Sequence, residues 1–115
     1  PEQWTYEYDL LSVTGKKIDV KTKGITNGIT PQPNYNVSVC ANNGKGITQE
    51  CDWYVFCHIS SDYKIGWIDG WLSKKDFLSL SRVYKKGTLD PQSGKTPFYF
   101  PVDTHIVNIK ELKTI

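Results

Sequence analysis

The chain has 115 residues, of which 38% are hydrophobic and 23% charged, and its formal net charge is +2. This length suits one domain with one core, so we expect a single domain over residues 1–115. The near balance of charge excludes binding to nucleic acid through overall basicity, and no apolar run is long enough to cross a membrane. We therefore expect a cytoplasmic protein whose partners recognise local clusters of residues.

The three cysteines, Cys40, Cys51 and Cys57, lack the close spacing that is typical of zinc and redox sites. We interpret them as reduced thiols packed in the interior. The alternative is a Cys40–Cys51 disulfide in a secreted, tryptophan-rich β domain that binds a ligand.

The first predicted element is a β-hairpin. Residues 5–12 are rich in aromatic and branched side chains, and residues 16–23 alternate between polar and apolar, so both segments are predicted to be strands. Gly15 between them suits the positive φ of a tight turn. The loop contains either three residues, Val13 to Gly15, or the last two of these.

The length of this loop decides which side chains share a face. With three residues, Ser12 pairs with Lys16, and Asp9 lies opposite Asp19 and points the same way. With two residues, the two carboxylates lie on opposite faces unless a bulge restores the parity. A site that needs both carboxylates therefore requires the longer loop.

The second strand of the hairpin has two chemically different faces. Alternation along the strand separates a charged face from an apolar one, which consist respectively of Lys17, Asp19, Lys21 and Lys23 and of Ile18, Val20 and Thr22. We expect the apolar face to pack against the core.

The rest of the chain predicts several strands and one main helix. Further strands are predicted at residues 35–40, 51–59, 64–72 and 105–112. The helix is predicted at residues 74–86, with Ser73 as its N-cap and Gly87 as its stop, and with Phe77, Leu80 and Tyr84 along one side. These elements favour an α/β, α+β-like fold around a central mixed sheet of about five to six strands.

The charged face offers the groups that hydrolyse phosphodiesters with the help of a metal. Carboxylate oxygens are the ligands that Mg²⁺ prefers, so Asp9 and Asp19 are the candidate ligands, with the backbone carbonyl of Val20 as a third. Lys21, two residues beyond Asp19, is placed to stabilise charge or to orient water. The alternative interpretation of Asp19 and Lys21 is a solvated strand face.

An aspartate ten positions before an Asp-x-Lys motif, on the two strands of a hairpin, resembles the PD-(D/E)XK nuclease superfamily. The wider text resembles small phage-encoded or restriction-related members, in the segments "YDLLSVTGKKIDVKTKG", "PNYNVSV", "CDWYVFCHI" and "GWIDGWLSKKDF". The resemblance implies a restriction-endonuclease-like core and a Mg²⁺- or Mn²⁺-dependent DNA endonuclease in the cytoplasm of a prokaryote or phage-infected host. It implies Asp9, Asp19 and Lys21 as the catalytic residues.

The sequence departs from the family pattern at its N-terminus. The family core begins with a helix that often carries a glutamate, whereas "PEQW" precedes the first strand here. Three explanations are open: the helix is truncated, a partner segment supplies it, or Glu2 or Glu7 substitutes. Of the two glutamates, Glu7 is the better candidate ligand because it shares the strand face of Asp9. Separately, cutting both strands of DNA commonly requires two active sites, which favours a homodimer.

Binding of DNA requires positive charge near the site. The candidate phosphate contacts are basic residues of the second strand and of the helical region, and Tyr35 with Asn36 are candidates for contacts to bases. The candidate DNA-binding residues are Lys16, Lys17, Lys23, Tyr35, Asn36, Lys74, Lys75, Arg82, Lys85, Lys86 and Lys95.

Other polar residues receive structural interpretations. His58 is interpreted as a histidine at the edge of the core with a hydrogen-bonded ring, and His105 as structural or exposed. Gly66 and Gly70 indicate a bulge or a close approach of backbones. The alternative function is a non-catalytic DNA-binding or protein-interaction module on the same fold.

Overall fold

The structure is a computed structural model that describes residues 8–41 and 46–115. Glu2, Glu7 and the first part of the predicted strand 5–12 lie outside the described residues. The described elements, in chain order, are β1 (Leu10–Leu11), β2 (Lys17–Ile25), β3 (Asn36–Cys40), β4 (Trp53–Ser60), β5 (Gly66–Ser73), α1 (Lys74–Leu80), β6 (Arg82–Tyr84), β7 (Thr104–Asn108) and the 3₁₀ helix η1 (Ile109–Glu111).

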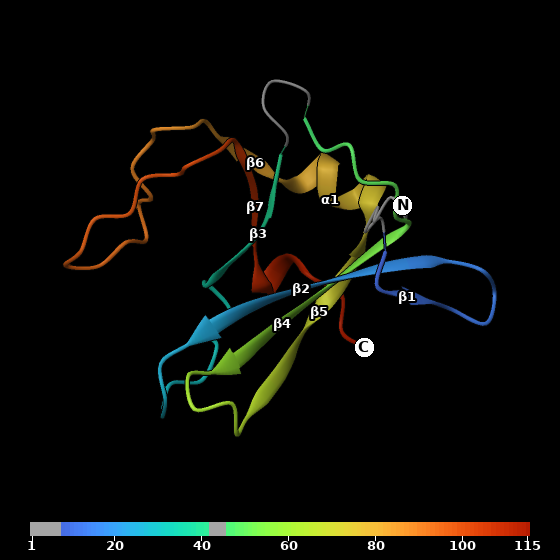
Figure 1. Cartoon of the computed structure of the whole chain (residues 1–115), viewed down its shortest axis with the longest axis horizontal. Coiled ribbons are helices and arrows are strands. Elements are labelled where there is room, and N and C mark those ends of the chain that lie inside the picture. Colours follow the sequence, from blue (N-terminus) through green and yellow to red (C-terminus); the bar gives the residue numbers. More distant parts are fainter. Residues whose placement is uncertain (1–7, 42–45) are drawn as a thin grey trace, which may run out of the picture.

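The first sheet has the strand order β1-β2-β4-β5 (Figure 1). β2 is parallel to β4, and the other two pairs are antiparallel. In the hairpin, the N–H of Ser12 donates to the carbonyl of Lys16 over 2.9 Å, and Leu10 pairs with Ile18. The three-residue loop is therefore confirmed, and Gly15 has the expected positive φ of 85°.

The second sheet has the order β3-β7-β6 and is antiparallel throughout. It lies with α1 above the first sheet in Figure 1. The mixed α/β character is confirmed, but the single central sheet is wrong, because the strands of the described chain divide into two sheets. Each sheet can bury one face against the other, which gives a short chain a core without a second helical layer.

The core lies between the two sheets and beneath α1. Tyr54 and Phe56 of β4 contact Phe77 of α1, with ring centroids 5.2 and 5.6 Å apart. Leu72 of β5 joins this cluster, together with valines of the second sheet. The central position predicted for "CDWYVFCHI" is confirmed, but only one face of β4 is fully buried, because its residues alternate between buried and half-buried.

The helix begins where it was predicted but ends six residues early. Ser73 is the N-cap, and its Oγ accepts a hydrogen bond from the N–H of Asp76 over 3.1 Å. The predicted continuation to residue 86 is wrong, because the helix ends at Leu80 and residues 82–84 form β6. The spacing of Phe77, Leu80 and Tyr84 suggests a longer helix, but Val83 and Tyr84 are residue types that favour strands, and β6 pairs with β7.

The apolar stripe predicted for that helix is correspondingly incomplete. Phe77 is fully buried, but Leu80 is 45% exposed, and Tyr84 lies on β6 with its ring against Phe100. Gly87 therefore stops no helix. The last predicted strand is also shorter than expected: β7 ends at Asn108, and a 3₁₀ turn follows.

Gly70 fits the predicted bulge. The register between β4 and β5 changes after Phe56, which pairs with Gly70 while Cys57 pairs with Ile68. Asp69 is consequently the extra residue of a β-bulge. Trp71, two residues after the bulge, exchanges two backbone hydrogen bonds of 2.9 Å with Lys113 on the outer edge of β5.

The cysteines form no disulfide, so the predicted thiols are confirmed and the Cys40–Cys51 disulfide is wrong. Their predicted burial holds for Cys51, whereas Cys57 is half-buried and Cys40 is exposed. Among the described residues, no helix has the length and apolar character that a membrane span requires.

Candidate functional site

The charged face of β2 points into the space between the sheets. In the parallel register, Asp19, Lys21 and Lys23 pair with Tyr54, Phe56 and His58, which are the buried side chains of β4. Residues that pair directly across strands share a face, so the charged residues lie on the core side. Our expectation that the apolar face would cover the core is therefore wrong: Ile18 and Val20 are half-buried on the other side.

Asp19 is the buried charge at the centre of this face. It is 5% exposed, and its Oδ2 lies 2.8 Å from the Nζ of Lys21, whose side chain remains 35% exposed. This close pair does not have hydrogen-bond geometry, so Oδ2 has no hydrogen-bond partner among the described residues. A buried carboxylate oxygen without a hydrogen bond is costly and is therefore open to a ligand.

Asp9 is held against the same part of β2. Its Oδ2 accepts a hydrogen bond of 2.7 Å from the N–H of Val20, and its own N–H donates to the carbonyl of Ile18 over 2.8 Å. Asp9 lies in a bend just before β1, and its carboxylate is next to Val20, the residue after Asp19. In a strand the N–H and C=O of one residue point to the same side, so the Val20 carbonyl faces the edge that Asp9 occupies.

Two further groups surround Asp19 from β4 and the segment before it. The hydroxyl of Tyr54 interacts with the thiol of Cys51 and has no well-formed hydrogen bond among the described residues. Burial raises the pKa of the Tyr54 hydroxyl, and the charge of Asp19 raises it further. Burial also raises the pKa of the Cys51 thiol, so both groups stay protonated at neutral pH.

The oxygen atoms of Asp9, Asp19 and Val20 are of the kind that Mg²⁺ binds. Within the described ranges, no three His, Cys, Asp or Glu side chains gather as a metal-ligand set, and Glu7 lies outside them. Mg²⁺ is nevertheless commonly held by one or two carboxylates, with water and substrate phosphate completing its shell. Asp9, Asp19 and the Val20 carbonyl are available as ligands of this kind, and the buried Oδ2 of Asp19, which has no hydrogen-bond partner among the described residues, is the observation that favours a ligand there.

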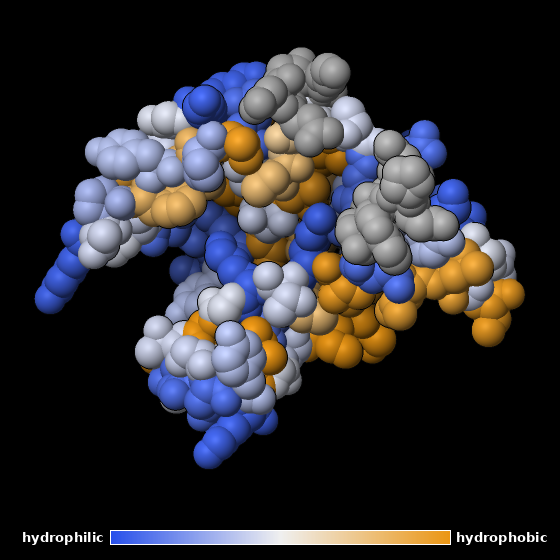
Figure 2. Space-filling view, viewed as in Figure 1, coloured by the Kyte–Doolittle hydropathy of each residue, from blue (hydrophilic) through white to orange (hydrophobic). Residues whose placement is uncertain are grey.

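A hollow continues from this site along β2. Lys21 and Lys23 line a pocket of about 130 Å³ with Val37 and Phe56, and Lys23 also lines a pocket of about 310 Å³ with Tyr35 and neighbouring residues. Figure 2 shows this side of the molecule as a hydrophilic hollow between the two layers. Lys23 and Tyr35, two of the predicted DNA contacts, are thus brought together in the larger pocket.

The remaining predicted DNA contacts do not form one surface. Arg82 lies 3.6 Å from Glu111 of η1, and Lys85 lies 3.4 Å from Asp103, just before β7. Each of these two cations is therefore paired with a carboxylate. The ammonium group of Lys74 donates to the backbone carbonyl of Gln49. Other predicted contacts are spread over the hairpin, the helix and the loops, namely Lys16, Lys17, Lys75, Lys86 and Lys95.

A buried histidine and aspartate join this hollow from the far end. The Nδ1 of His58 lies 2.6 Å from the Oδ2 of Asp69, and their side chains are 3% and 2% exposed. The hydrogen-bonded ring predicted for His58 is confirmed. The partner was missed, because alternation along β5 assigns Asp69 to the face opposite Leu72 and the bulge reverses this assignment.

Comparison of the chain with protein-family models, with curated proteins and with solved structures gives no match.

Proposed function

We propose that the protein is a divalent-metal-dependent DNA endonuclease that hydrolyses phosphodiester bonds with Asp9, Asp19 and Lys21. The observation that carries this proposal is the buried carboxylate of Asp19, which has an ammonium group 2.8 Å away and no hydrogen bond to the oxygen nearest it. A solvated strand face would leave both charges in water, whereas Asp19 is 5% exposed. The burial supports a functional interpretation of the pair.

Each residue has a role that its position supports. Asp9 and Asp19, with the carbonyl of Val20, would hold Mg²⁺ or Mn²⁺, which supplies charge neutralisation and an activated water when bound. The N–H of Val20 fixes the Asp9 carboxylate over 2.7 Å, so one ligand is oriented before metal arrives. The half-exposed ammonium of Lys21 stands where it can stabilise negative charge on an incoming phosphate.

The surroundings support an anionic substrate in a reducing compartment. Lys21 and Lys23 present two cations along the floor of the hollow, within reach of a phosphate backbone. The three cysteines are thiols, as expected for a cytoplasmic protein. We accordingly include DNA as the partner and the cytoplasm as the location in the proposal.

Nicking of supercoiled plasmid in Mg²⁺ or Mn²⁺ tests the proposal. We expect Asp9→Asn, Asp19→Asn and Lys21→Gln each to reduce the nicking rate by about 100-fold or more, because each removes a charge that acts on the phosphate or its metal. Far-ultraviolet circular dichroism and thermal melting establish that the variants remain folded.

Asp52→Asn is the matched control. The Oδ2 of Asp52 accepts a backbone hydrogen bond of 2.7 Å from Lys17 of β2, as that of Asp9 does from Val20. Asp52, however, precedes β4 and bonds to the backbone of Lys17, whereas Asp9 precedes β1 and bonds to the backbone of Ile18 and Val20. We expect this variant to nick DNA at the wild-type rate. Wild-type nicking by folded Asp19→Asn would remove the assignment, and DNA binding without cleavage by the wild-type protein would favour the non-catalytic module.

A further inference from the structure

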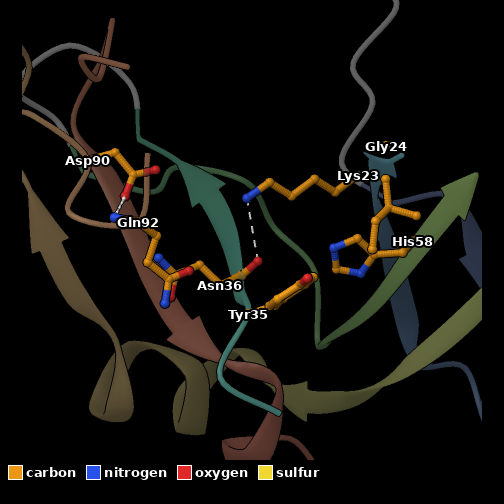
Figure 3. Close-up of a pocket in the computed structure, with 8 residues that line it drawn as sticks. Lys23, Gly24, Tyr35, Asn36, His58, Asp90 and Gln92 are labelled. Atoms are coloured by element: carbon orange, nitrogen blue, oxygen red, sulfur yellow. Dashed lines mark hydrogen bonds between the residues drawn. The ribbon is translucent and has the colours of Figure 1, made fainter. Parts of the chain in front are cut away.

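The pocket of about 310 Å³ at the far end of the hollow has the chemistry of a ligand site. Lys23 and His58 enter it from the first sheet, and Asn36 and Gln92 face them from the other side, with the ring of Tyr35 between (Figure 3). The lining combines a cation, an aromatic ring, an imidazole and two amides with the carboxylate of Asp90, which accepts a hydrogen bond from the backbone N–H of Gln92. Of these groups, only Lys23 also has a role in the proposed function, as a cation for the phosphate backbone.

The imidazole of His58 is held ready for a ligand. Asp69 takes Nδ1 at 2.6 Å, and the ring points into the pocket in Figure 3, so Nε2 is the nitrogen left for a ligand. The bulge at Asp69 brings the carboxylate to this face, and bulges next to functional sites commonly re-aim a side chain in this way. The edge of the Tyr35 ring packs on His58, with centroids 6.5 Å apart, and further fixes both rings.

The opposite wall is also ordered by hydrogen bonds. The Nε2 of Gln92 donates to the carbonyl of Asn34 over 2.8 Å, and the backbone N–H of Gln92 donates to Asp90 over 2.9 Å. The side-chain amide of Gln92 is thereby held at the wall of the pocket. Amides, carboxylates and imidazoles read the edges of nucleobases, and an aromatic ring gives a base a surface to stack on.

The pocket is in register with the proposed cleavage site. Lys23 lies two residues beyond Lys21 on the same face of β2, a separation of about 7 Å along a strand. This step is comparable to the separation of neighbouring phosphates in a single strand. A strand whose one phosphate reaches Lys21 would therefore bring the next to Lys23 and its base to Tyr35 and His58.

We propose that this pocket binds one unpaired nucleotide of the DNA strand, next to the phosphate that Asp19 and Lys21 act on. The inference rests on the proposed nuclease function and deepens it, because it names the substrate class as DNA with a single-stranded segment. A base in an intact duplex is stacked and paired and must be extruded before it can enter such a pocket.

Binding of a fluorescent single strand and of the matching blunt duplex, with the metal chelated, tests the proposal without cleavage. Tyr35→Leu keeps apolar volume but removes the stacking ring, and we expect it to weaken single-strand binding about tenfold and duplex binding less than about twofold. Gln92→Leu, on the exposed loop, provides a second variant that leaves the core unchanged. Tyr99→Leu is the matched control, because Tyr99 is 57% exposed and outside the pocket.

The outcomes separate the pocket from the nuclease. Equal losses for the two DNA forms, or wild-type affinity for both pocket variants, would overturn the pocket assignment even if plasmid nicking depends on Asp19. A selective loss of single-strand binding in both variants, with Tyr99→Leu unchanged, supports it. That result would stand even if Asp19→Asn still nicked plasmid, which would overturn the nuclease alone.

Discussion

Two pairs of acid and base lie on the inner face of the first sheet and are built differently. Asp19 and Lys21 are two residues apart on β2, 2.8 Å from each other, and the lysine keeps 35% of its side chain exposed. His58 and Asp69 join β4 to β5 over 2.6 Å, and both are almost fully buried. The ammonium group of the first pair can exchange its partner with solvent or substrate. In the second pair the buried contact to Asp69 fixes the His58 ring, which lines the larger pocket with its other nitrogen.

The largest difference between the pairs should appear when the acid is removed. We expect Asp69→Ala to lower the free energy of unfolding by about 4 kcal/mol, because the polar ring of His58 would remain buried without its partner. Urea denaturation measures this, with Asp52→Ala, at an exposed carboxylate, as control. A loss below about 1 kcal/mol would contradict a scaffold role for the buried pair.

The bulge that creates the second pair should be almost as sensitive. Gly70 has a φ of 148°, and a Cβ there would lie 2.6 Å from the carbonyl oxygen of Lys113 and 2.7 Å from the Cβ of Leu112. We expect Gly70→Ala to cost about 3 kcal/mol in the same denaturation experiment.

Gly24→Ala is the control for this substitution, because a Cβ at Gly24 meets no atom within 4 Å. Equal stability of the two alanine variants would show that the close approach at Gly70 relaxes at little cost.

The first pair should be far less important for stability. We expect Asp19→Asn to change the free energy of unfolding by no more than about 1 kcal/mol, since Lys21 can remain hydrated and a buried charge is removed. The same variant is expected to lose nicking activity. A large destabilisation would place Asp19 in the scaffold and would undermine the contrast between the pairs.

The smallest expected effect on stability concerns His105 of the second sheet, whose ring contacts a hydroxyl group where His58 contacts a carboxylate. His105 is half-buried on β7, and its Nδ1 lies 3.1 Å from the hydroxyl of Ser81. Burial lowers the pKa of His105, and the charge of Asp103 opposes this shift.

The unfolded chain therefore binds a proton at this histidine at a higher pH than the folded protein does. Stability should fall as the pH drops below about 6.5, the value of an unperturbed histidine. We expect His105→Gln to remove part of that slope in thermal melts recorded between neutral and weakly acidic pH. An unchanged slope would assign the pH dependence to other groups.

The sequence was sufficient where a local pattern decides the structure. The hairpin turn follows from Gly15, the start of the helix from the Ser73 cap, and the central strands from their continuous apolar text. These features depend on neighbours in the chain, so they need no knowledge of distant contacts. The proximity of Asp9 to Val20 and of Asp19 to Lys21 likewise follows from the local hairpin. The function of these residues is a prediction.

The features that were missed depend on contacts between distant segments. The spacing of apolar residues assigns residues 82–84 to the helix, but they pair with β7, and β3 pairs with β7 across more than half of the chain. The burial of Asp19 follows from which side of β2 the second sheet covers, and alternation alone does not determine this. The His58–Asp69 pair requires a bulge, which a regular strand pattern excludes.

The bridge between Trp71 and Lys113 has a consequence for how copies of the protein meet. β5 is an outer strand of its sheet, and outer strands offer unpaired backbone groups to other chains. Lys113 donates one backbone hydrogen bond to Trp71 on this edge and accepts another from it. The ammonium group of Lys113 also lies 5.1 Å from the centre of the Trp71 ring. The backbone groups of Trp71 are therefore not available for pairing with a strand of another copy.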